Sequence, residues 1–499
     1  MYSSKNRTAN IEFWQSLFTA NSVAVIGANT NIGSWGFNVL STLKDLQKKT
    51  KDRRIYAVNP SRSEVLGLPS YKSILDIPEE VGLAIIVIPA EKVPQVLSDC
   101  AQKKVGATIT ISAGFAESDE AGERLELELI QIANNQVIKF VGPNCVGHAD
   151  TYSSLASIGF ASSMKPGPLA VISQSGTIGA YISTTASRMG LGISKFVSTG
   201  NEANQHLEDC LEYLAQDEHT RIIAAYIEGL REGRRFVQLA KEITARKPII
   251  VLKAGGTKDS ARAAKSHTGA LTGSNAVYTA AFKQSGVIQV DDEEEICDLA
   301  MALLHQPFPK GNRIGILTIG GGLGVVATEV VEKEGLVMAK LEPASLDKLN
   351  AILPSRWSHG NPVDTAGIFN RPMDHASTVL SCLGILMEDA NIDGVISLAS
   401  PLVSTFGSNN NLNTEQINAI RHSNNNNMET LLSFIKRNHK PLIIYERAEP
   451  RSPEDESSTL SLFRKYGVPV YQNIHRAVRI LRHLVWYRNY LQARNLSDT

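Results

Sequence analysis

One histidine in the chain lies among small and hydroxylated residues, where its ring is open to chemistry. His267 stands in the segment KAGGTKDSARAAKSHTGALTGS, just after the apolar run KPIIVLK, and Ser266 and Thr268 flank it. When a partner holds the N–H of a neutral imidazole, the other nitrogen is a nucleophile. A lone loop histidine is usually only solvated, so the residue by itself leaves both interpretations open.

A carboxylate suited to hold this imidazole ends another apolar run. Glu228 closes the segment RIIAAYIEG, at the carboxyl end of a predicted strand. There it can accept the imidazole N–H, fix the tautomer and stabilise the charged ring after attack. The structural alternative is that Glu228 pairs with Arg231 or Arg234.

The SQSG turn at residues 173–176 is a candidate phosphate site. Ser173, Ser175 and Gly176 come between the run PLAVI and a helix expected over Thr177–Met189. The unpaired N–H groups and positive dipole end of a helix favour a bound phosphate. Ordinary N-capping by Ser175 explains the same residues.

The elements that must position these residues follow a βαβ pattern. From Ser22 to about His148, short β-branched runs alternate with helix-length segments, as in an open parallel sheet. Two further units begin at PLAVISQSG and RIGILTIGGG, after segments rich in Ser, Gly or Pro. We therefore expect an α/β protein with domains at 1–150, 151–305 and 306–499, each opening on a strand and a glycine-bearing turn.

The first unit resembles a dinucleotide fold but lacks its fingerprint. Asn29 stands where the second close-spaced glycine belongs, and the strand RRIYAVNP ends in Asn59 and Pro60 instead of an acidic residue. This disfavours an NAD dehydrogenase and leaves a Rossmann-like sheet that binds another phosphorylated nucleotide. Alternatively, the glycine turn serves only packing.

A second turn at the same edge of the predicted sheet is GPNCVG, residues 142–147. Its Asn144 can hydrogen-bond an amide-rich ligand tail. The alternative is that this segment is an ordinary turn without a ligand.

Composition restricts the class of protein further. Fifty basic residues balance fifty acidic ones among 499, which gives no general field for nucleic acid or an anionic membrane. The five cysteines are widely spaced and lack zinc-site spacing, as expected for reduced cytosolic thiols. No apolar stretch is long enough for a membrane span or a signal peptide. We expect a cytoplasmic protein.

Taken together, these motifs resemble the NDP-forming acyl-CoA synthetases, closest to the ADP-forming acetate-type branch. The resemblance runs from about Phe13 to Leu491 and is carried by VISQSGTIGAYI, FVSTGNEA, YIEGLREGRRF, GPNCVG, NPVD and the highly specific SHTGALTGSNAVYTAAFKQSGVIQV. It implies a CoA-binding Rossmann-like domain followed by two flavodoxin-like ligase domains. The motifs GGGLG at 320–324 and NPVD at 361–364 fit the pattern without a defined chemical role.

The resemblance also implies site residues. His267 would be the phosphohistidine, Glu228 its stabilising acid, and Ser173, Ser175 and Gly176 the phosphate seat. The turns around CoA would be formed by Gly27, Ala28, Asn59, Pro60, Pro89 and Asn144. No metal ligand is assigned. Family members often carry acidic residues after GNEA, whereas this chain has Asn204, Gln205 and His206, which puts contacts made through that loop in doubt.

The implied reaction interconverts acyl-CoA, phosphate and ADP with acid, CoA and ATP through phosphohistidine. The chain has neither a P-loop nor an acidic ATP-grasp segment. ADP or ATP and Mg²⁺ would therefore bind to a separate ATP-grasp β subunit, and this chain would be the α-type carrier. A non-catalytic CoA-binding module or scaffold, related to protein lysine acetyltransferases, is the alternative. The identity of the acid and the choice between ADP and GDP are open, and the Asn-rich stretch 408–427 is expected to be a mobile surface insertion.

Overall fold

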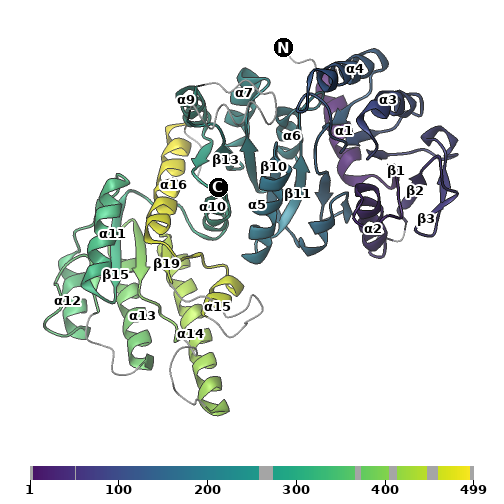
Figure 1. Cartoon of the computed structure of the whole chain (residues 1–499). Helices are drawn as coiled ribbons and strands as arrows, with labels where there is room; N and C mark the ends of the chain where they lie inside the picture. Colours follow the sequence, from purple (N-terminus) through teal and green to yellow (C-terminus); the bar gives the residue numbers. More distant parts are fainter. Residues whose placement is uncertain are drawn as a thin grey trace. The chain divides into compact units, whose positions relative to one another are not determined.

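The computed structural model describes residues 4–50, 52–257, 274–365, 372–403, 413–446 and 459–494. The chain divides into two compact units, Met1–Ile296 and Cys297–Thr499, coloured purple to teal and green to yellow in Figure 1. His267 lies outside the described residues. Each unit is built on mostly parallel sheets, which confirms the α/β class expected from the sequence.

The first unit begins with a seven-stranded sheet in the order β3-β4-β2-β1-β5-β6-β7. Only the β3–β4 pair is antiparallel. Its strands are β1 (Ser22–Ile26), β2 (Arg54–Val58), β3 (Glu64–Val65), β4 (Leu68–Tyr71), β5 (Leu83–Ile86), β6 (Ala107–Thr110) and β7 (Phe140–Val141). Its helices are α1 (Ser4–Thr19), α2 (Trp35–Gln47), α3 (Val93–Gln102) and α4 (Glu120–Gln136), with short 3-10 turns η1 (Ile74–Asp76) and η2 (Ala90–Lys92).

A second seven-stranded sheet of the same unit has the order β14-β13-β12-β10-β11-β8-β9. Its strands are β8 (His148–Asp150), β9 (Leu155–Ala156), β10 (Pro166–Ser173), β11 (Ile193–Ser198), β12 (Ile222–Ile227), β13 (Ile249–Lys253) and β14 (Ile288–Val290). β8 and β9 form an antiparallel edge on β11. The helical elements are η3 (Gly159–Ser163), α5 (Gly176–Arg188), α6 (Leu207–Leu214), α7 (Gly233–Ile243) and α9 (Asn275–Ser285). Helix α10 (Glu293–His305) begins in this unit and continues past Ile296 into the second.

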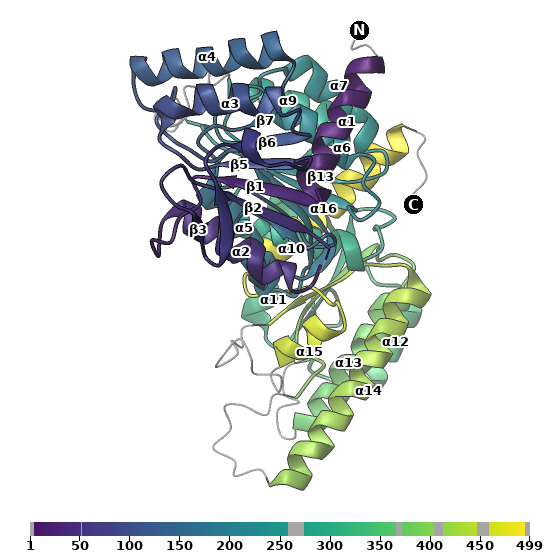
Figure 2. The same ribbon diagram turned by 90° about the vertical axis from the view of Figure 1, so that its right-hand side faces the viewer.

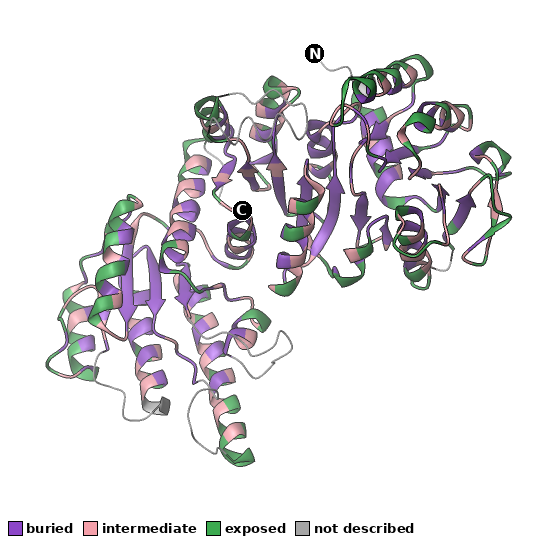
Figure 3. Cartoon of the chain, in the orientation of Figure 1, coloured by how far each residue is buried: buried purple, intermediate pink, exposed green. Residues whose placement is uncertain are grey.

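The central strands are buried along their length because helices cover both faces of parallel sheets (Figure 3). β1 and β5 are buried at every position, and both are runs of Val, Ile, Leu and Ala apart from Ser22. One apolar core runs from Trp14 on α1 through both sheets to Phe282 on α9. Because the two sheets share this core, the turns at their strand ends are held in fixed relation.

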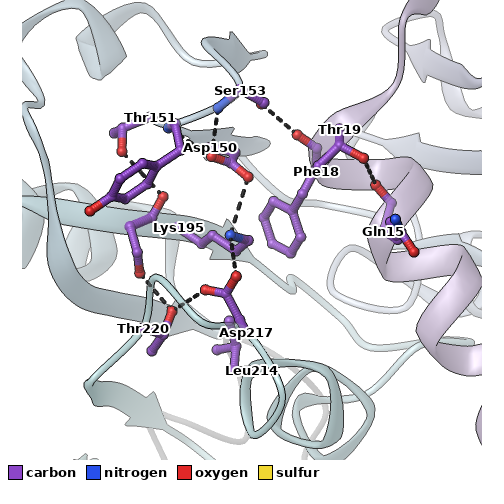
Figure 4. Close-up of polar contacts among 12 residues, drawn as sticks. Gln15, Phe18, Thr19, Asp150, Thr151, Ser153, Lys195, Leu214, Asp217 and Thr220 are labelled. Atoms are coloured by element: carbon purple, nitrogen blue, oxygen red, sulfur yellow. Dashed lines mark hydrogen bonds and ion pairs between the residues drawn. The ribbon is translucent and has the colours of Figure 1, made fainter.

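A buried ammonium group reinforces the junction between the two sheets (Figure 4). Lys195 Nζ on β11 lies 3.2 Å from Asp150 Oδ2 and 2.9 Å from Asp217 Oδ1, and these three side chains are at most 8% exposed. The other oxygen of Asp150 accepts hydrogen bonds from the N–H groups of Tyr152 and Ser153, at 2.8 and 3.1 Å. The Ser153 hydroxyl in turn donates to the Phe18 carbonyl of α1 at 2.7 Å.

Arg53 makes a second connection across the same junction. Its guanidinium donates to the Ser153 and Ser154 carbonyls at 2.8 and 2.6 Å, and its Nε donates to the Ala20 carbonyl at 3.1 Å. A planar guanidinium has five donors, which suits it to bind several carbonyls at once. The short segment after β8 is therefore fixed to the first sheet from both sides.

The second unit contains a six-stranded parallel sheet in the order β16-β15-β18-β19-β20, with β17 also paired to β15. Its strands are β15 (Arg313–Thr318), β16 (Val337–Met338), β17 (Val363–Asp364), β18 (Gly394–Leu398), β19 (Leu442–Tyr445) and β20 (Val470–Tyr471). Its helices are α11 (Gly321–Lys333), α12 (Pro343–Ile352), α13 (Pro372–Glu388), α14 (Thr414–Asn438), α15 (Thr459–Lys465) and α16 (Ile474–Ala493). α13 packs against α12 and α14 (Figure 2).

The expectation of a mobile insertion over residues 408–427 is wrong where the structure describes that stretch. Residues 408–412 lie outside the described residues, but 414–427 form the first half of α14. Asn413 caps this helix through a reciprocal pair of hydrogen bonds with Gln416. The buried Asn424 side chain exchanges two hydrogen bonds of 2.9 Å with the Val403 backbone. The asparagines thus satisfy backbone groups, and Met428 and Leu431 supply the apolar anchors further along.

The NPVD motif has a structural role in the second unit. The Asn361 amide accepts a hydrogen bond from Ile316 N at 2.9 Å and donates to the Ile314 and Ala339 carbonyls at 2.8 and 2.9 Å. The side chain therefore completes hydrogen bonds at the edge of β15.

In the described part of the chain, no helix is both long enough and apolar enough to cross a membrane.

Replacing Lys195 with methionine is expected to destabilise the first unit strongly. The substitution leaves the Asp150 and Asp217 carboxylates buried without their cation, which typically costs about 3–5 kcal/mol. Lys48→Met is the matched control, because Lys48 pairs with Asp45 at the exposed surface of α2, where solvent screens the pair. Thermal and urea unfolding of both variants measure the difference. An equal, small loss in the two variants would contradict the structural role of Lys195.

Candidate active site

The turn after β1 is shaped by two glycines. Gly27 has φ +94°, and a Cβ on it would lie 2.4 Å from the Val87 carbonyl oxygen. Gly36, in the first turn of α2, lies so close that its Cβ would be 2.0 Å from the Gly27 carbonyl oxygen. Close packing of the strand, turn and helix therefore accounts for both residues. Ala28 is fully buried beside them.

The predicted CoA-binding residues of the first sheet lie on its strand-end turns. Asn59 Nδ2 donates to the Ala28 carbonyl at 2.8 Å, so the turns after β1 and β2 are joined directly. Asn59 Oδ1 accepts from Ser61 N at 2.9 Å. Pro60 is exposed next to it, and Pro89 is exposed at the start of η2. Both ends of the Asn59 side-chain amide are therefore used in hydrogen bonds within the protein.

Asn144 lies where the first sheet meets the second. It adopts φ 57° after the cis Gly142–Pro143 bond, and its backbone N–H donates to the Ser112 carbonyl at 2.9 Å. Its Nδ2 donates to Asn201 Oδ1 at 3.1 Å. These contacts leave Asn144 half-buried in the wall of a cavity.

The SQSG turn begins α5 as expected from the sequence. The buried Ser173 hydroxyl donates to the Ser175 carbonyl at 2.5 Å, and Ser175 caps the helix by accepting from Ile178 N at 3.4 Å. At Gly176 a Cβ would lie 2.2 Å from a methyl carbon of Val146. Glycine is needed there because the GPNCVG segment packs directly on the start of the helix. The first N–H groups of such a helix have no intrahelical acceptor and favour anions.

A cavity of about 430 Å³ lies between the GPNCVG segment and the start of α5. Its walls include Trp35, Ile88 and Ser112 from the first sheet side, Asn144 from the GPNCVG segment, and Ser175 and Gly176 from the phosphate turn. It is large enough for a small-molecule ligand. Asn144 is the predicted CoA residue that lines this cavity, together with Ser175 and Gly176 of the predicted phosphate turn. The other residues predicted for CoA or phosphate do not line it: Gly27, Ala28, Asn59, Pro60, Pro89 and Ser173.

Glu228 directly follows β12 and is buried, with 4% of its surface exposed. Tyr226, two residues earlier, hydrogen-bonds the Glu228 carboxylate; burial and this negative neighbour raise the pKa of Tyr226 to about 12. The guanidinium of Arg231 donates to the Asn201 carbonyl at 2.9 Å. The described residues that contact Glu228 therefore include a tyrosine hydroxyl that can orient its carboxylate.

Gln174, in the middle of the SQSG turn, is a residue that the sequence did not single out. Its Nε2 donates to Glu202 Oε2 at 2.9 Å and to the Gly229 carbonyl at 2.7 Å. Its Oε1 accepts from the backbone N–H groups of Glu228 and Gly229. One buried side chain therefore fixes the phosphate turn against the end of β12, where Glu228 begins.

Lys253 ends β13, the strand next to β12, where the register pairs it with Ile227. Its Nζ donates to the Glu228 carbonyl at 3.0 Å and lies 4.5 Å from the centre of the Tyr278 ring. Burial lowers the pKa of this ammonium group. The segment that carries His267 leaves the sheet after Lys253, at the same edge as Glu228. A contact between His267 and Glu228 stays a prediction, since His267 lies outside the described residues.

Glu202 of the GNEA motif and Glu208 on α6 are a buried pair of carboxyl groups. Burial, with the nearby Glu208 carboxylate, raises the pKa of Glu202 to about 8. Burial likewise raises the pKa of Glu208, whose Oε1 accepts from Glu232 N at 3.0 Å. Glu202 Oε1 accepts from Leu207 N at 3.1 Å. The carboxyl group of Glu202 therefore holds its proton to a higher pH than an exposed glutamate does.

The loop that departs from the family pattern is used to hold the first sheet. Asn204 Oδ1 accepts from Phe140 N at 3.1 Å, and Gln205 N donates to the Phe140 carbonyl at 3.2 Å, both at β7. His206 N donates to Asp209 Oδ2 at 2.9 Å at the start of α6. Asn204 and Gln205 therefore extend the junction between the sheets, whereas the contact of His206 lies within α6.

Two families of domains match the chain. The CoA binding domain matches residues 21–150, and the succinyl-CoA ligase like flavodoxin domain matches residues 166–303. Together with the cavity that Asn144 and the phosphate turn line, these matches place the chain in the class of CoA ligases. The resemblance inferred from the motifs is confirmed.

Relatives give the same result along most of the sequence. The alpha subunit of acetate–CoA ligase [ADP-forming] II from Pyrococcus furiosus is 41% identical over 78% of this chain and 82% of its own length. Acetate–CoA ligase [ADP-forming] I from Archaeoglobus fulgidus is 40% identical over 77% of this chain, and the match covers 54% of that protein. The chain belongs to the ADP-forming acyl-CoA synthetase family.

Solved structures agree over almost the whole chain. A protein from Pyrococcus horikoshii OT3 is 34% identical with a TM-score of 0.76, and the match covers 96% of this chain and 99% of that one. The dinucleotide forming acetyl-coenzyme A synthetase 1 of Ca. Korarchaeum cryptofilum, solved with phosphate and ADP, is 29% identical with a TM-score of 0.80, covering 97% of this chain and 99% of that one.

Replacing Gln174 with alanine is expected to lower stability by at least about 2 kcal/mol, because it removes several buried hydrogen bonds and leaves two backbone N–H groups unsatisfied. Gln216→Ala is the control, since Gln216 is exposed just after α6. Urea unfolding measures both. A loss no larger in Gln174→Ala than in the control would show that Gln174 does not fix the turn.

The stability of the first unit is expected to fall as pH rises from about 6.5 to about 8. Above about pH 6.5 the buried His148 and His206, whose pKa values burial lowers, are neutral in both the folded and the unfolded chain. In this range the folded chain keeps a proton on Glu202 that the unfolded chain releases, at a cost of about 1.4 kcal/mol per pH unit for each such proton. Glu208→Gln removes the like charge and its own raised pKa, so the fall becomes shallower, whereas exposed Glu242→Gln leaves it unchanged. Thermal unfolding midpoints from pH 6.5 to 8 test this. Parallel curves for wild type and Glu208→Gln would contradict it.

Proposed function

We propose that this chain is the CoA-binding, phosphohistidine-carrying subunit of an ADP-forming acyl-CoA synthetase. The observation that carries the proposal is the shared cavity, in which Asn144 of the GPNCVG segment and Ser175 and Gly176 of the phosphate turn form adjacent walls. A thioester end and a phosphate bound in this cavity would be close enough to react. Membership of the family supports a ligase over a non-catalytic CoA-binding scaffold.

In the first step an oxygen of phosphate attacks the thioester carbonyl. The C–S bond breaks, CoA leaves as its thiol after taking a proton, and an acyl phosphate remains. The start of α5 is suited to hold this phosphate, because helix N-terminal N–H groups bind anions. Gln174 holds that turn against the end of β12, so the phosphate-binding turn and Glu228 keep a fixed relative position.

In the second step a ring nitrogen of His267 attacks phosphorus, the bond to the carboxylate oxygen breaks, and the acid leaves. Glu228 accepts the N–H of the other ring nitrogen and stabilises the positive charge that develops. Tyr226 orients the Glu228 carboxylate for this task. The buried ammonium of Lys253 lies at the same strand ends.

In the third step phosphohistidine transfers its phosphoryl group to the terminal phosphate oxygen of ADP. We assign ADP and Mg²⁺ to a separate ATP-grasp β subunit. Two relatives from Pyrococcus furiosus, named alpha subunits, support a divided enzyme. The covalent intermediate allows the CoA and nucleotide reactions to occur at different places.

The proposal predicts that γ-labelled ATP phosphorylates this chain in the holoenzyme, giving an acid-labile, base-stable label. His267→Ala is expected to abolish the label, and Glu228→Gln to slow it on the order of 10²-fold. His422→Ala is the control, because His422 is exposed on α14. The label is followed by gel autoradiography after acid and base treatment.

The outcomes separate the competing functions. Absence of label on the wild-type chain in the presence of its ATP-grasp subunit would favour the scaffold. Label that persists in His267→Ala would overturn the assignment of the carrier. Full ATP synthesis by the isolated chain would contradict the need for a second subunit.

A further inference from the structure

A second cavity of the first unit adjoins the candidate active site. It has a volume of about 560 Å³. Trp35, Val146, Gly176 and Thr177 line both cavities. The first residues of α5 therefore separate the two cavities, and a group bound at these residues is adjacent to both cavities.

Three elements form the walls of this second cavity. α2 contributes one face, the segment around η3 contributes another, and α5 closes it from Gly176 to Ala180. η3 contacts both helices, so the three walls belong to one packed arrangement. Phe160 on η3 packs edge-on against Phe196, with ring centroids 5.4 Å apart.

The chemistry of the walls changes with distance from the phosphate turn. Val146, Ile158, Phe160 and Ala180 give an apolar surface near α5. The α2 wall carries small polar side chains, which are Asn38, Ser41 and Thr42. The Ser157 hydroxyl is already bonded to His148, accepting from its backbone N–H at 2.9 Å.

The walls of the second cavity carry little charge, and that charge is negative. Among the described residues that line the cavity, Asp45 is the only charged one. It lies on the exposed side of α2 and pairs with Lys48 at 2.8 Å, and the hydrogen bond and charge of Lys48 lower its pKa. Asp45 is therefore negative at neutral pH.

We propose that this second cavity binds the tail of the acyl group, and that the acid is a monocarboxylic acid whose tail is uncharged and longer than that of acetate. This inference rests on the proposed function, because it uses the phosphate seat at α5. An acyl phosphate bound there has its phosphoryl group at the boundary of the two cavities. The first cavity, walled by the turns around Asn144, then holds the thiol end of CoA, and the acyl tail extends into the second.

Size favours a tail longer than a methyl group. An acetyl group has three non-hydrogen atoms, whereas the cavity of about 560 Å³ has room for many water molecules at about 30 Å³ each. An apolar chain that covers the wall formed by Val146, Ile158 and Ala180 removes more apolar surface from water than a methyl group does. The longer acyl group therefore binds more tightly.

Charge disfavours a dicarboxylic acid. A second carboxylate in the cavity would lose water without gaining a cation from the described walls, which is strongly unfavourable. Succinate is thus predicted to be a poor substrate, although this chain shares a domain type with succinyl-CoA ligase.

The test measures phosphorylation of the chain in the holoenzyme from labelled phosphate and a series of acyl-CoA thioesters: acetyl, hexanoyl and succinyl. Hexanoyl-CoA is expected to give the highest kcat/KM and succinyl-CoA the lowest. Ala180→Phe and Thr42→Phe, which fill the cavity from opposite walls, are expected to reduce kcat/KM for hexanoyl-CoA at least about tenfold and to change that for acetyl-CoA little. Tyr181→Trp is the matched control, because it enlarges an exposed side chain of α5 outside both cavities.

The outcomes distinguish this inference from the function on which it rests. If no thioester labels the wild-type chain, the proposed function and the cavity assignment both fail. If acetyl-CoA labels the chain but hexanoyl-CoA does not, or if succinyl-CoA equals hexanoyl-CoA, only the assignment of the acid fails. Equal losses for acetyl-CoA and hexanoyl-CoA in both filling variants would mean that the cavity holds a part common to all thioesters, and would likewise overturn the assignment.

Discussion

The buried ammonium of Lys195 between Asp150 and Asp217 is the interaction on which the candidate site depends most. The site combines turns from two sheets, and those sheets have separate strand orders and separate helices. The shared apolar core is non-directional, whereas an ion triad with defined hydrogen-bond partners specifies one arrangement. It fixes the segment after β8 and, through Ser153, the end of α1. The segment that links the two sheets is therefore held by directional contacts as well as by apolar packing.

Within that geometry, Gln174 connects the parts that must act together. From its place in the phosphate turn, its amide contacts two other segments: the end of β12 and Glu202 of the GNEA motif. A buried amide donates and accepts simultaneously, so it can join a carboxyl group and two backbone N–H groups without adding charge. This neutrality matters in a site that is proposed to hold phosphate, since another carboxylate at this position would repel the anion.

The sequence predicted the long elements and the strand-end turns because their signals are local. The strands near Ile26, Val58 and Ile86 follow from β-branched runs, and the helix after SQSG follows from its cap. The pairs β3–β4 and β8–β9 were missed, since strands of two to four residues carry no period. The roles of Gln174 and Glu202 were also missed, because their partners lie up to 55 residues away. The cavities could not be predicted for the same reason.

Gly36 limits how this site can diversify in evolution. Its backbone lies against the Gly27 carbonyl, so α2 cannot slide without disturbing the turn after β1. The same helix carries Asn38, Ser41 and Thr42 into the wall of the second cavity. If the second cavity binds the acyl tail, as proposed, a change of the preferred acid requires exchanging side chains along a helix whose position Gly36 fixes. Divergence within the family should accordingly be recorded at these three positions, while the helix axis and its glycine persist.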